Sequence, residues 1–221
     1  MTTQPEQILE DNLVKQLTSL GYGYIRIKDE PDLLVNLKTQ LEKHNQTTFT
    51  QKEFERILNH LNKGNVFERA KILRDRMQLT RDNGDSSYIE FIQQEHWCQN
   101  QFQVTQQVTI EGTYKNRYDV TLLVNGLPLV QIELKRRGLE LKEAFNQINR
   151  YQRHSFWASS GLFQYVQIFV ISNGVNTKYY ANNRNQSFKQ TFYWTDILNK
   201  PITQLEAFTW EFLEPCNMSK I

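Results

Sequence analysis

Cysteine is almost absent from this chain of 221 residues, which contains only Cys98 and Cys216. Two thiols so far apart are too few for a disulfide framework and have the wrong spacing for a zinc site. Long apolar runs are absent as well, because none approaches the roughly 18 residues that cross a bilayer. The N-terminus also lacks the basic and apolar regions of a signal peptide. We therefore expect a cytoplasmic protein with two free thiols and no membrane partner.

Neither sign of charge dominates, since 26 basic residues stand against 24 acidic ones and the formal net charge is +2. This balance excludes a histone-like or tail-like binder, so any affinity for nucleic acid must come from local clusters of charge. With 39% hydrophobic and 12% aromatic residues, the composition fits a globular domain that can bury a core.

Several catalytic patterns are missing. The sequence contains no G-x-x-x-x-G-K-[ST], no G-x-G-x-x-G, no G-x-S-x-G and no H-E-x-x-H, and its four histidines are scattered. Nucleotide hydrolysis at a phosphate loop, dinucleotide binding, serine hydrolase chemistry and zinc protease chemistry therefore have no support.

Along the chain, apolar residues are spaced with the period of a helix in some segments and with the period of a strand in others. The pattern predicts a mixed sheet with helices on its faces, an α/β fold, because strands both precede and follow a central helix. We expect a domain over residues 1–214 with a helical insertion at about 31–78, and the start of a linker at 215–221. The predicted helices are 5–20, 31–44, 51–61, 66–77, 139–154 and about 202–212, and the predicted strands are 22–27, 88–92, 102–110, 118–124, 127–135, 165–171 and 178–181.

The dipeptide Asn125-Gly126 lies between two apolar runs, which is the strongest short-range signal for a hairpin. It places Asp119 and Glu133 on two paired strands. A plain two-residue turn would leave these carboxylates on opposite faces of the sheet, where they could not share an ion. A three-residue loop or one bulged residue would put them opposite each other, and Pro128 is a natural place for the irregularity because it lacks a ladder donor.

Together, Asp119 and Glu133 have the hard oxygens that Mg²⁺ prefers. Lys135 follows Glu133 by two residues and shares its side of the strand, so it would lie beside a water that attacks phosphorus. The alternative is an ordinary solvated hairpin, because an E-x-K triplet arises about once by chance in a chain this long. The residues alone leave both interpretations open.

The segment after the hairpin is locally basic. Gln147 and Tyr151 lie one turn apart on the same face of the predicted helix. Between Glu133 and Arg153 the chain carries an excess of positive charge, which would attract a phosphate backbone unless it simply forms a solvated helix face. Its basic residues are Lys135, Arg136, Arg137, Lys142, Arg150 and Arg153, against three acidic residues.

These residues resemble a known family. Asp119 with Glu133-Leu134-Lys135 is similar to the PD-(D/E)xK nucleases. The segment 116–135 closely resembles the N-terminal nuclease domain of the restriction (HsdR) subunit of type I restriction-modification enzymes. Residues 147–151 resemble that family's Q-x-x-x-Y motif, which RecB-type nucleases share, and residues 9–22 resemble its first helix.

The resemblance implies Mg²⁺-dependent cleavage of double-stranded DNA, in a complex with methylation and specificity subunits. ATP would enter only through a motor region, whose nucleotide-binding motifs this chain lacks. The alternative is a DNA-binding or subunit-docking module that keeps the fold but cannot cut, and the intact Asp119, Glu133 and Lys135 favour the nuclease. The resemblance adds Glu10 to the site. We therefore expect catalytic roles for Asp119, Glu133, Lys135, Glu10, Gln147 and Tyr151, metal binding by Asp119, Glu133 and Leu134, and DNA binding by Arg117, Arg136, Arg137, Arg150 and Arg153.

Overall fold

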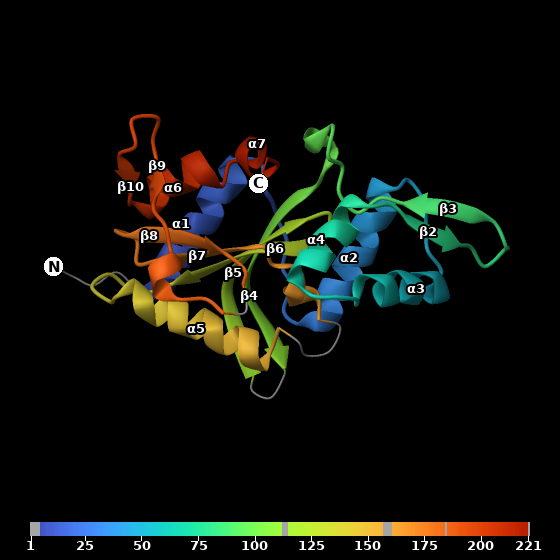
Figure 1. Cartoon of the computed structure of the whole chain (residues 1–221), viewed down its shortest axis with the longest axis horizontal. Coiled ribbons are helices and arrows are strands. Elements are labelled where there is room, and N and C mark those ends of the chain that lie inside the picture. Colours follow the sequence, from blue (N-terminus) through green and yellow to red (C-terminus); the bar gives the residue numbers. More distant parts are fainter. Residues whose placement is uncertain (1–4, 112–114, 157–160, 184, 221) are drawn as a thin grey trace.

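A six-stranded mixed sheet forms the centre of the protein (Figure 1). The structure is a computed structural model that describes residues 5–111, 115–156, 161–183 and 185–220; the first four residues, on which part of the signal-peptide argument rests, lie outside the described residues. The strand order is β1-β4-β5-β6-β7-β8, with β1–β4 and β6–β7 parallel and the other three pairs antiparallel. The strands are β1 (Gly23–Tyr24), β4 (Phe102–Glu111), β5 (Lys115–Val124), β6 (Leu127–Leu134), β7 (Ile168–Ser172) and β8 (Thr177–Ala181).

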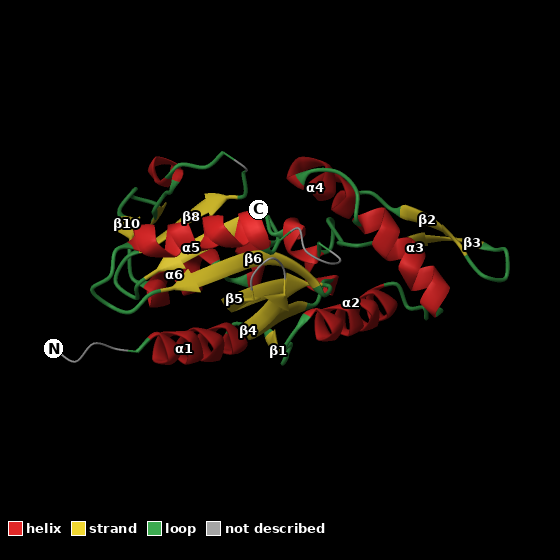
Figure 2. Ribbon diagram, turned by 90° about the horizontal axis from the view of Figure 1, so that it is seen from below, coloured by secondary structure: helices red, strands yellow, loops and turns green. Residues whose placement is uncertain are grey.

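Helices cover both faces of this sheet (Figures 1 and 2), which confirms the predicted α/β class. One hydrophobic core is shared with α1 (Glu6–Ser19) and α6 (Leu205–Phe212), and it receives alternate residues of β6, among them Val130, Ile132 and Leu134. The other core is covered by α5 (Leu141–His154). Within the described ranges, no helix combines the length and the apolar character that a membrane span requires.

The insertion contains α2 (Glu30–His44), α3 (Gln51–Leu61) and α4 (Val66–Arg74), and it lies at one end of the molecule (Figures 1 and 2). Asn65 and Glu68 form a capping box that begins α4. The predicted helix over 66–77 is too long, because Asp75 is already extended (φ −90°, ψ 151°). Met77 instead begins β2 (Met77–Thr80), which pairs with β3 (Ser86–Ile89).

This small hairpin corrects the sequence analysis in a second respect. The strand predicted at 88–92 belongs to β3 and pairs with β2, so it is not part of the central sheet. Met77 and Leu79 are buried while Gln78 and Thr80 are exposed, the alternation of a half-buried strand. The sequence analysis assigned Met77 to the preceding helix because this residue also fits the helical spacing of that segment.

Other boundaries shift by a few residues. The strand predicted at 22–27 is paired over Gly23–Tyr24, since the N–H of Ile27 is taken by the hydroxyl of Thr105 (3.3 Å) in place of a backbone carbonyl. The strand predicted from residue 165 is preceded by a 3-10 turn, η2 (Leu162–Tyr165). The remaining elements are η1 (Trp97–Gln99), η3 (Phe188–Gln190), β9 (Trp194–Thr195), β10 (Pro201–Ile202) and α7 (Pro215–Met218), the last within the segment expected to begin a linker.

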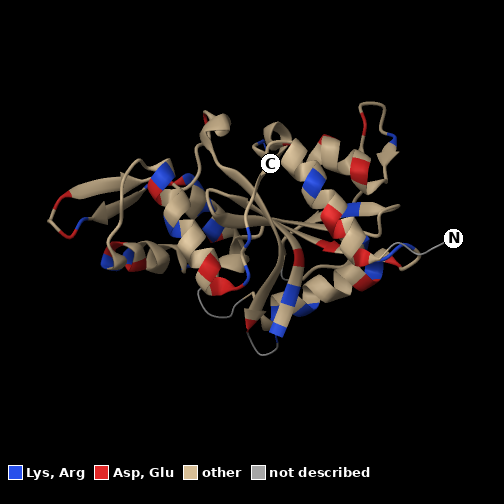
Figure 3. Cartoon of the chain, turned by 180° about the vertical axis from the view of Figure 1, so that it is seen from behind, with Lys and Arg blue, Asp and Glu red and all other residues tan. Residues whose placement is uncertain are grey.

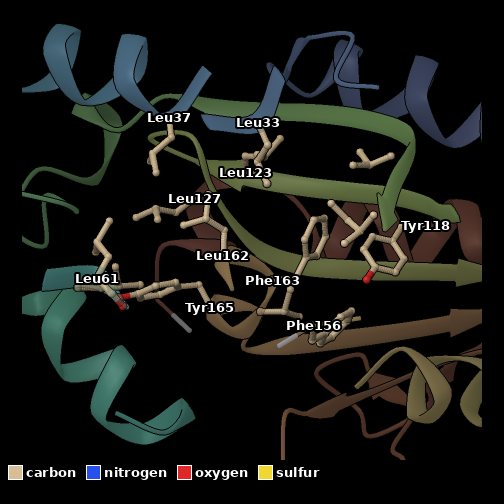
Figure 4. Close-up of a cluster of buried hydrophobic side chains, with 14 of the residues drawn as sticks. Leu33, Leu37, Leu61, Tyr118, Leu123, Leu127, Phe156, Leu162, Phe163 and Tyr165 are labelled. Atoms are coloured by element: carbon tan, nitrogen blue, oxygen red, sulfur yellow. The ribbon is translucent and has the colours of Figure 1, made fainter. Parts of the chain in front are cut away.

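The insertion is joined to the sheet through a continuous apolar cluster (Figure 4). Leu37 of α2 is fully buried against the turn between β5 and β6, beside Leu123 and Leu127. Tyr118 extends the same cluster, with its ring centroid 4.5 Å from that of Phe163. The insertion therefore helps to fix the hairpin from which the carboxylates of the predicted site project.

The hairpin contains the predicted bulge. Leu123 pairs with Pro128, but Leu122 pairs with Val130, so Leu129 is an extra residue on β6. The turn itself has two residues rather than three, and the shift occurs immediately after Pro128. Beyond this bulge, each residue of β5 pairs with the residue of β6 that lies one position further along the chain than in a regular hairpin.

A substitution at the turn tests how strongly this geometry is fixed. Gly126 has a φ of +83°, and a Cβ added to it would lie 2.8 Å from the backbone Cα of Leu37. We expect Gly126→Ala to lower the free energy of unfolding by about 2–4 kcal/mol, through the left-handed backbone and overpacking together. Gly84→Ala is the matched control: φ is +90°, but no described atom lies within 4 Å of its added Cβ, so a loss of about 1 kcal/mol is expected. Equal losses in urea unfolding would show that α2 does not constrain the turn.

Candidate active site

The bulge brings Asp119 and Glu133 together on the two central strands of the sheet, near the C-terminal end of β6. Val120 pairs with Ile132, so the next residues outward, Asp119 and Glu133, face each other. Asp119 is 7% exposed and Glu133 is fully buried. One oxygen of Asp119, Oδ2, accepts the backbone N–H of Leu134 at 2.7 Å, which fixes the carboxylate across the two strands.

Burial sets the electrostatics of this pair. It raises the pKa of Glu133 well above its usual range, and the charge of Asp119 raises it further, while Lys135 opposes the shift. Burial also raises the pKa of Asp119, against the hydrogen bond from Leu134 and the charge of Lys135. The two carboxyl groups face each other across the paired strands, and the charge of Asp119 acts on Glu133. A site of this kind holds a shared proton or a cation, because two bare carboxylates repel each other.

Lys135 lies against the pair. Its Nζ is 3.3 Å from Oε1 of Glu133 and donates a hydrogen bond to the carbonyl of Leu134 at 3.0 Å. Its backbone N–H donates to the carbonyl of Ser172 on β7 at 2.8 Å, so the ladder holds this residue in strand geometry beyond the end of β6. The residue is 8% exposed, and its ammonium is directed toward Glu133.

Helix α5 contributes a phenol and an amide. The hydroxyl of Tyr151 donates to the carbonyl of Arg117 at 2.9 Å and lies 3.5 Å from Oε1 of Glu133. Gln147, one turn earlier, donates its amide N–H to the same hydroxyl. The Tyr151 ring packs edge to face on Tyr118, with centroids 4.7 Å apart. Tyr151 of the Q-x-x-x-Y pattern thus lies beside Glu133, and Gln147 contacts the Tyr151 hydroxyl.

Glu10 reaches the site from α1. It is 2% exposed, and its Oε2 accepts the side-chain N–H of Gln107 at 3.1 Å. Burial, with a smaller contribution from Asp119, raises the pKa of Glu10 to about 7, although Gln107 and the charge of Arg117 oppose the shift. The acid expected on the first helix is therefore close enough to Asp119 to feel its charge.

Gln107 is a site residue that the sequence analysis missed. It lies on β4 between the residues that pair with Val120 and Tyr118, and therefore opposite Asp119, with a φ of +58°. The side chains of β4 point into different cores before and after Gln107. Val104 belongs to the core under α1, and Val108 belongs to the core that α5 covers. Strained backbone of this kind gathers at functional sites. The signal that could have found it is Gln106, which interrupts the apolar alternation of β4 immediately before Gln107.

The five arginines expected to bind DNA are exposed, but they are not all at one place. The positive charge of Arg117 lowers the pKa of Glu10. The backbone N–H of Arg136 donates to the carboxylate of Glu6 on α1 at 3.2 Å. Arg150 lies 5.8 Å from the centre of the Tyr151 ring. Arg153 lines a separate cavity. Along the whole chain, basic and acidic segments are interspersed (Figure 3), so any attraction for phosphate is local.

A metal ion fits the donors that the two strands bring together. In the ranges described above, no three His, Cys, Asp or Glu side chains form a metal cluster by themselves. Magnesium usually takes one or two carboxylates and completes its shell with water and substrate oxygens. Oε2 of Glu133 is buried and receives no hydrogen bond from a described donor, which leaves it available to a cation. The carboxylates of Asp119 and Glu133 with the Leu134 carbonyl are the candidate ligands.

The fold and the buried Asp-Glu-Lys arrangement define a restriction-endonuclease-like α/β domain. The family model for the type I restriction enzyme R protein N terminus matches residues 3–188. The chain therefore belongs to this family.

Individual relatives agree with this assignment. The chain is 48% identical, over its whole length, to the type I restriction enzyme SsaAORF53P endonuclease subunit of Staphylococcus saprophyticus, of which it covers 24%. It is 46% identical to the SauCOLORF180P endonuclease subunit of Staphylococcus aureus, again covering 24%. Over 96% of the chain it is 39% identical to the EcoprrI endonuclease subunit of Escherichia coli, of which it covers 70%. The chain thus spans about a quarter of the staphylococcal subunits.

Because the pKa of Glu10 is raised, the free energy of unfolding should depend on pH through this residue. The carboxyl titrates at about 7 in the folded protein and at 4.5 ordinarily, so the folded state binds its proton more tightly. The tighter binding of the Glu10 proton in the folded state adds to the free energy of unfolding. This contribution is complete below pH 4.5 and is lost as the pH rises through about 7. Glu10→Gln removes the titration. Relative to wild type, we expect the variant to gain about 1–3 kcal/mol between pH 4.5 and about pH 8.

Urea unfolding at the two pH values measures this gain. Glu206→Gln, at an exposed position on α6, controls for the loss of one negative charge. A difference between Glu10→Gln and wild type that does not change with pH would contradict the assignment.

Proposed function

We propose that this domain hydrolyses phosphodiester bonds in double-stranded DNA with the help of Mg²⁺. The observation that carries the proposal is the buried pair Asp119 and Glu133 with the ammonium of Lys135 against it. Burying three ionisable groups costs free energy, and a solvated hairpin would have no reason to bear that cost. A hydrolase has one, since charge develops on the phosphate as the bond breaks.

The carboxylates of Asp119 and Glu133 and the carbonyl of Leu134 would hold the magnesium ion. When bound there, Mg²⁺ lowers the pKa of a coordinated water and neutralises charge that develops on the phosphate. The Leu134 N–H holds Asp119 in place, and the ammonium of Lys135 donates to Oε1 of Glu133 at 3.3 Å. Both ligands are therefore orientated by hydrogen bonds before a cation arrives.

Lys135 has the role of a donor at the reacting centre. Its ammonium is anchored by Oε1 of Glu133 and the Leu134 carbonyl, and it has a third N–H to offer. We assign that N–H to the attacking water or to a phosphate oxygen, where it counters the charge of the pentavalent phosphorus. Arg117, Arg136, Arg137 and Arg150 would then contact phosphates along the strand.

The wider activity also belongs to this proposal. The relatives named above are endonuclease subunits of type I restriction enzymes, and by analogy the partners of this chain would be methylation and specificity subunits. ATP would act only through a motor region beyond these residues. Recognition of a DNA sequence would then reside in the partners, and the hydrolysis in the site on β5 and β6.

Metal binding gives one test. Asp119→Asn keeps an oxygen for the Leu134 N–H but removes a charged ligand, so we expect Mg²⁺ or Mn²⁺ to bind at least about tenfold more weakly. Isothermal titration of the 221-residue chain measures the affinity. Asp75→Asn, at an exposed position after α4, is the matched control. The same affinity in all three proteins would remove the metal from this hairpin.

Cleavage gives the other test. In the full-length subunit assembled with its partners, we expect Lys135→Ala to reduce DNA cleavage about 10²- to 10³-fold, because one donor at a charge-developing centre is lost. Metal binding, folding and ATP hydrolysis by the motor should be largely retained. Lys142→Ala is the control, since Lys142 is exposed on α5 in the second E-x-K triplet. An undiminished rate in Lys135→Ala would favour the docking-module interpretation.

A further inference from the structure

Strand β4 is connected to helix α1 by the side chain of Gln107. Its Nε2 donates a hydrogen bond to Oε1 of Gln7 and another to Oε2 of Glu10, the latter at 3.1 Å. Gln7 and Glu10 lie on the same face of α1, because they are three positions apart. A carboxamide has two N–H donors, so the Gln107 amide uses both of them on this one face of the helix.

The backbone at Gln107 is held in an unfavourable conformation. Its φ is +58°, in the left-handed region, where the Cβ of an L-residue is crowded. Glycine has no Cβ and adopts this conformation without the same cost. The chain nevertheless has a glutamine here, so the side chain has to offset the cost. Within the described ranges, the two hydrogen bonds to α1 are the polar contacts that this side chain makes.

These two hydrogen bonds are not the main attachment of α1 to the sheet. Leu13 and Leu17 of the helix are 2% and 0% exposed, and together with Leu9 they pack into the core beneath it. Burial of a stripe of apolar side chains is the main force that keeps an amphipathic helix in place. We therefore expect loss of the Gln107 amide to change the direction of the side chains that it binds, and to leave the helix where it is.

Of the two partners on α1, Glu10 belongs to the candidate site. It is 2% exposed, and the charge of Asp119 acts on its carboxyl group. In the part of the chain that the structure describes, Gln107 is the donor of the one side-chain hydrogen bond that Glu10 accepts. Gln107 also lies opposite Asp119 on the neighbouring strand. The amide therefore fixes the Glu10 carboxylate close to Asp119.

We propose that Gln107 is a positioning residue of the hydrolytic site, whose side-chain amide holds the carboxylate of Glu10 beside Asp119. This inference rests on the proposed function. Among the described residues, no three His, Cys, Asp or Glu side chains form a metal cluster, so Glu10 lies outside the two candidate carboxylate ligands. From this position its carboxylate accepts hydrogen bonds from water around a cation and adds negative charge that attracts the cation. The bond from Gln107 sets the direction in which that carboxylate points.

The first measurement needs no metal. In the 221-residue chain, ¹³C NMR follows the side-chain carboxyl of Glu10 as a function of pH. Gln107→Met keeps the length of the side chain but has no N–H. Because the N–H of Gln107 favours the charged carboxylate, we expect the pKa of Glu10 to rise above its wild-type value of about 7 in this variant. The other charges that act on Glu10, from Asp119, Arg117 and Asp11, are the same in both proteins.

The second measurement is isothermal titration with Mn²⁺. Loss of a hydrogen bond that orients a group around a metal typically weakens metal binding by about 10- to 100-fold, so we expect Gln107→Met to bind Mn²⁺ at least about tenfold more weakly than wild type. Gln106→Met is the matched control, since Gln106 is the neighbouring residue of β4 and has no described hydrogen bond to Glu10. It should keep both the wild-type affinity and the wild-type pKa of Glu10.

Urea unfolding separates positioning from a purely structural role. We expect the unfolding midpoint of Gln107→Met to stay close to that of wild type, because the apolar face of α1 is intact. Weaker Mn²⁺ binding that comes with a lower midpoint and an unchanged pKa of Glu10 would overturn the proposal. Equal effects of Gln107→Met and Gln106→Met, or no effect of Gln107→Met on the pKa and the affinity, would overturn it as well.

Titration of Asp119→Asn with Mn²⁺ keeps this inference distinct from the proposed function. If Asp119→Asn weakens Mn²⁺ binding and Gln107→Met does not, the metal site stands and the role of Gln107 is wrong. If neither variant weakens binding, the metal site is wrong and the role of Gln107 falls with it. Weaker binding in both variants, with the pKa of Glu10 raised in Gln107→Met, supports both.

Discussion

The site depends on one extra residue in a strand. Leu129 shifts the register of β6 against β5, and without it Asp119 and Glu133 would lie on opposite faces of the sheet. The turn before the bulge is clamped by α2, whose backbone approaches Gly126 closely. The insertion is therefore more than an addition to the surface. It packs on the hairpin through the apolar cluster of Figure 4 and holds the turn that the bulge requires.

Once the register is set, burial creates the chemistry. The two carboxyl groups and Glu10 all have raised pKa values because the sheet and α1 exclude water from them. In bulk water these groups would each be an ordinary anion. Enclosed together, they favour binding a proton or a cation over remaining as bare anions. The same enclosure strengthens the attraction of Lys135 for developing negative charge, since the local dielectric constant is low.

The sequence was sufficient for the parts of this arrangement that repeat a local rule. Asn125-Gly126 predicted the hairpin, the parity of Asp119 and Glu133 required a bulge, and the spacing of Gln147 and Tyr151 placed both on one helix face. Gln107 was missed, because one polar residue in the alternation, Gln106, does not by itself predict the positive φ with which β4 crosses between two cores. Strand β2 was missed because four residues are too few to separate a period of 2 from one of 3.6.

Helix α5 connects the carboxylate site to the loop after β8. Its buried residues pack on β6 and β7, so the helix cannot rotate without disturbing the contacts on both of its flanks. Tyr151, which lies 3.5 Å from Oε1 of Glu133, precedes Gln152, which is hydrogen-bonded to Asn182. The phenol beside Glu133 and the amide that binds the loop therefore lie in one helical turn, and the packing of that turn on the sheet positions both.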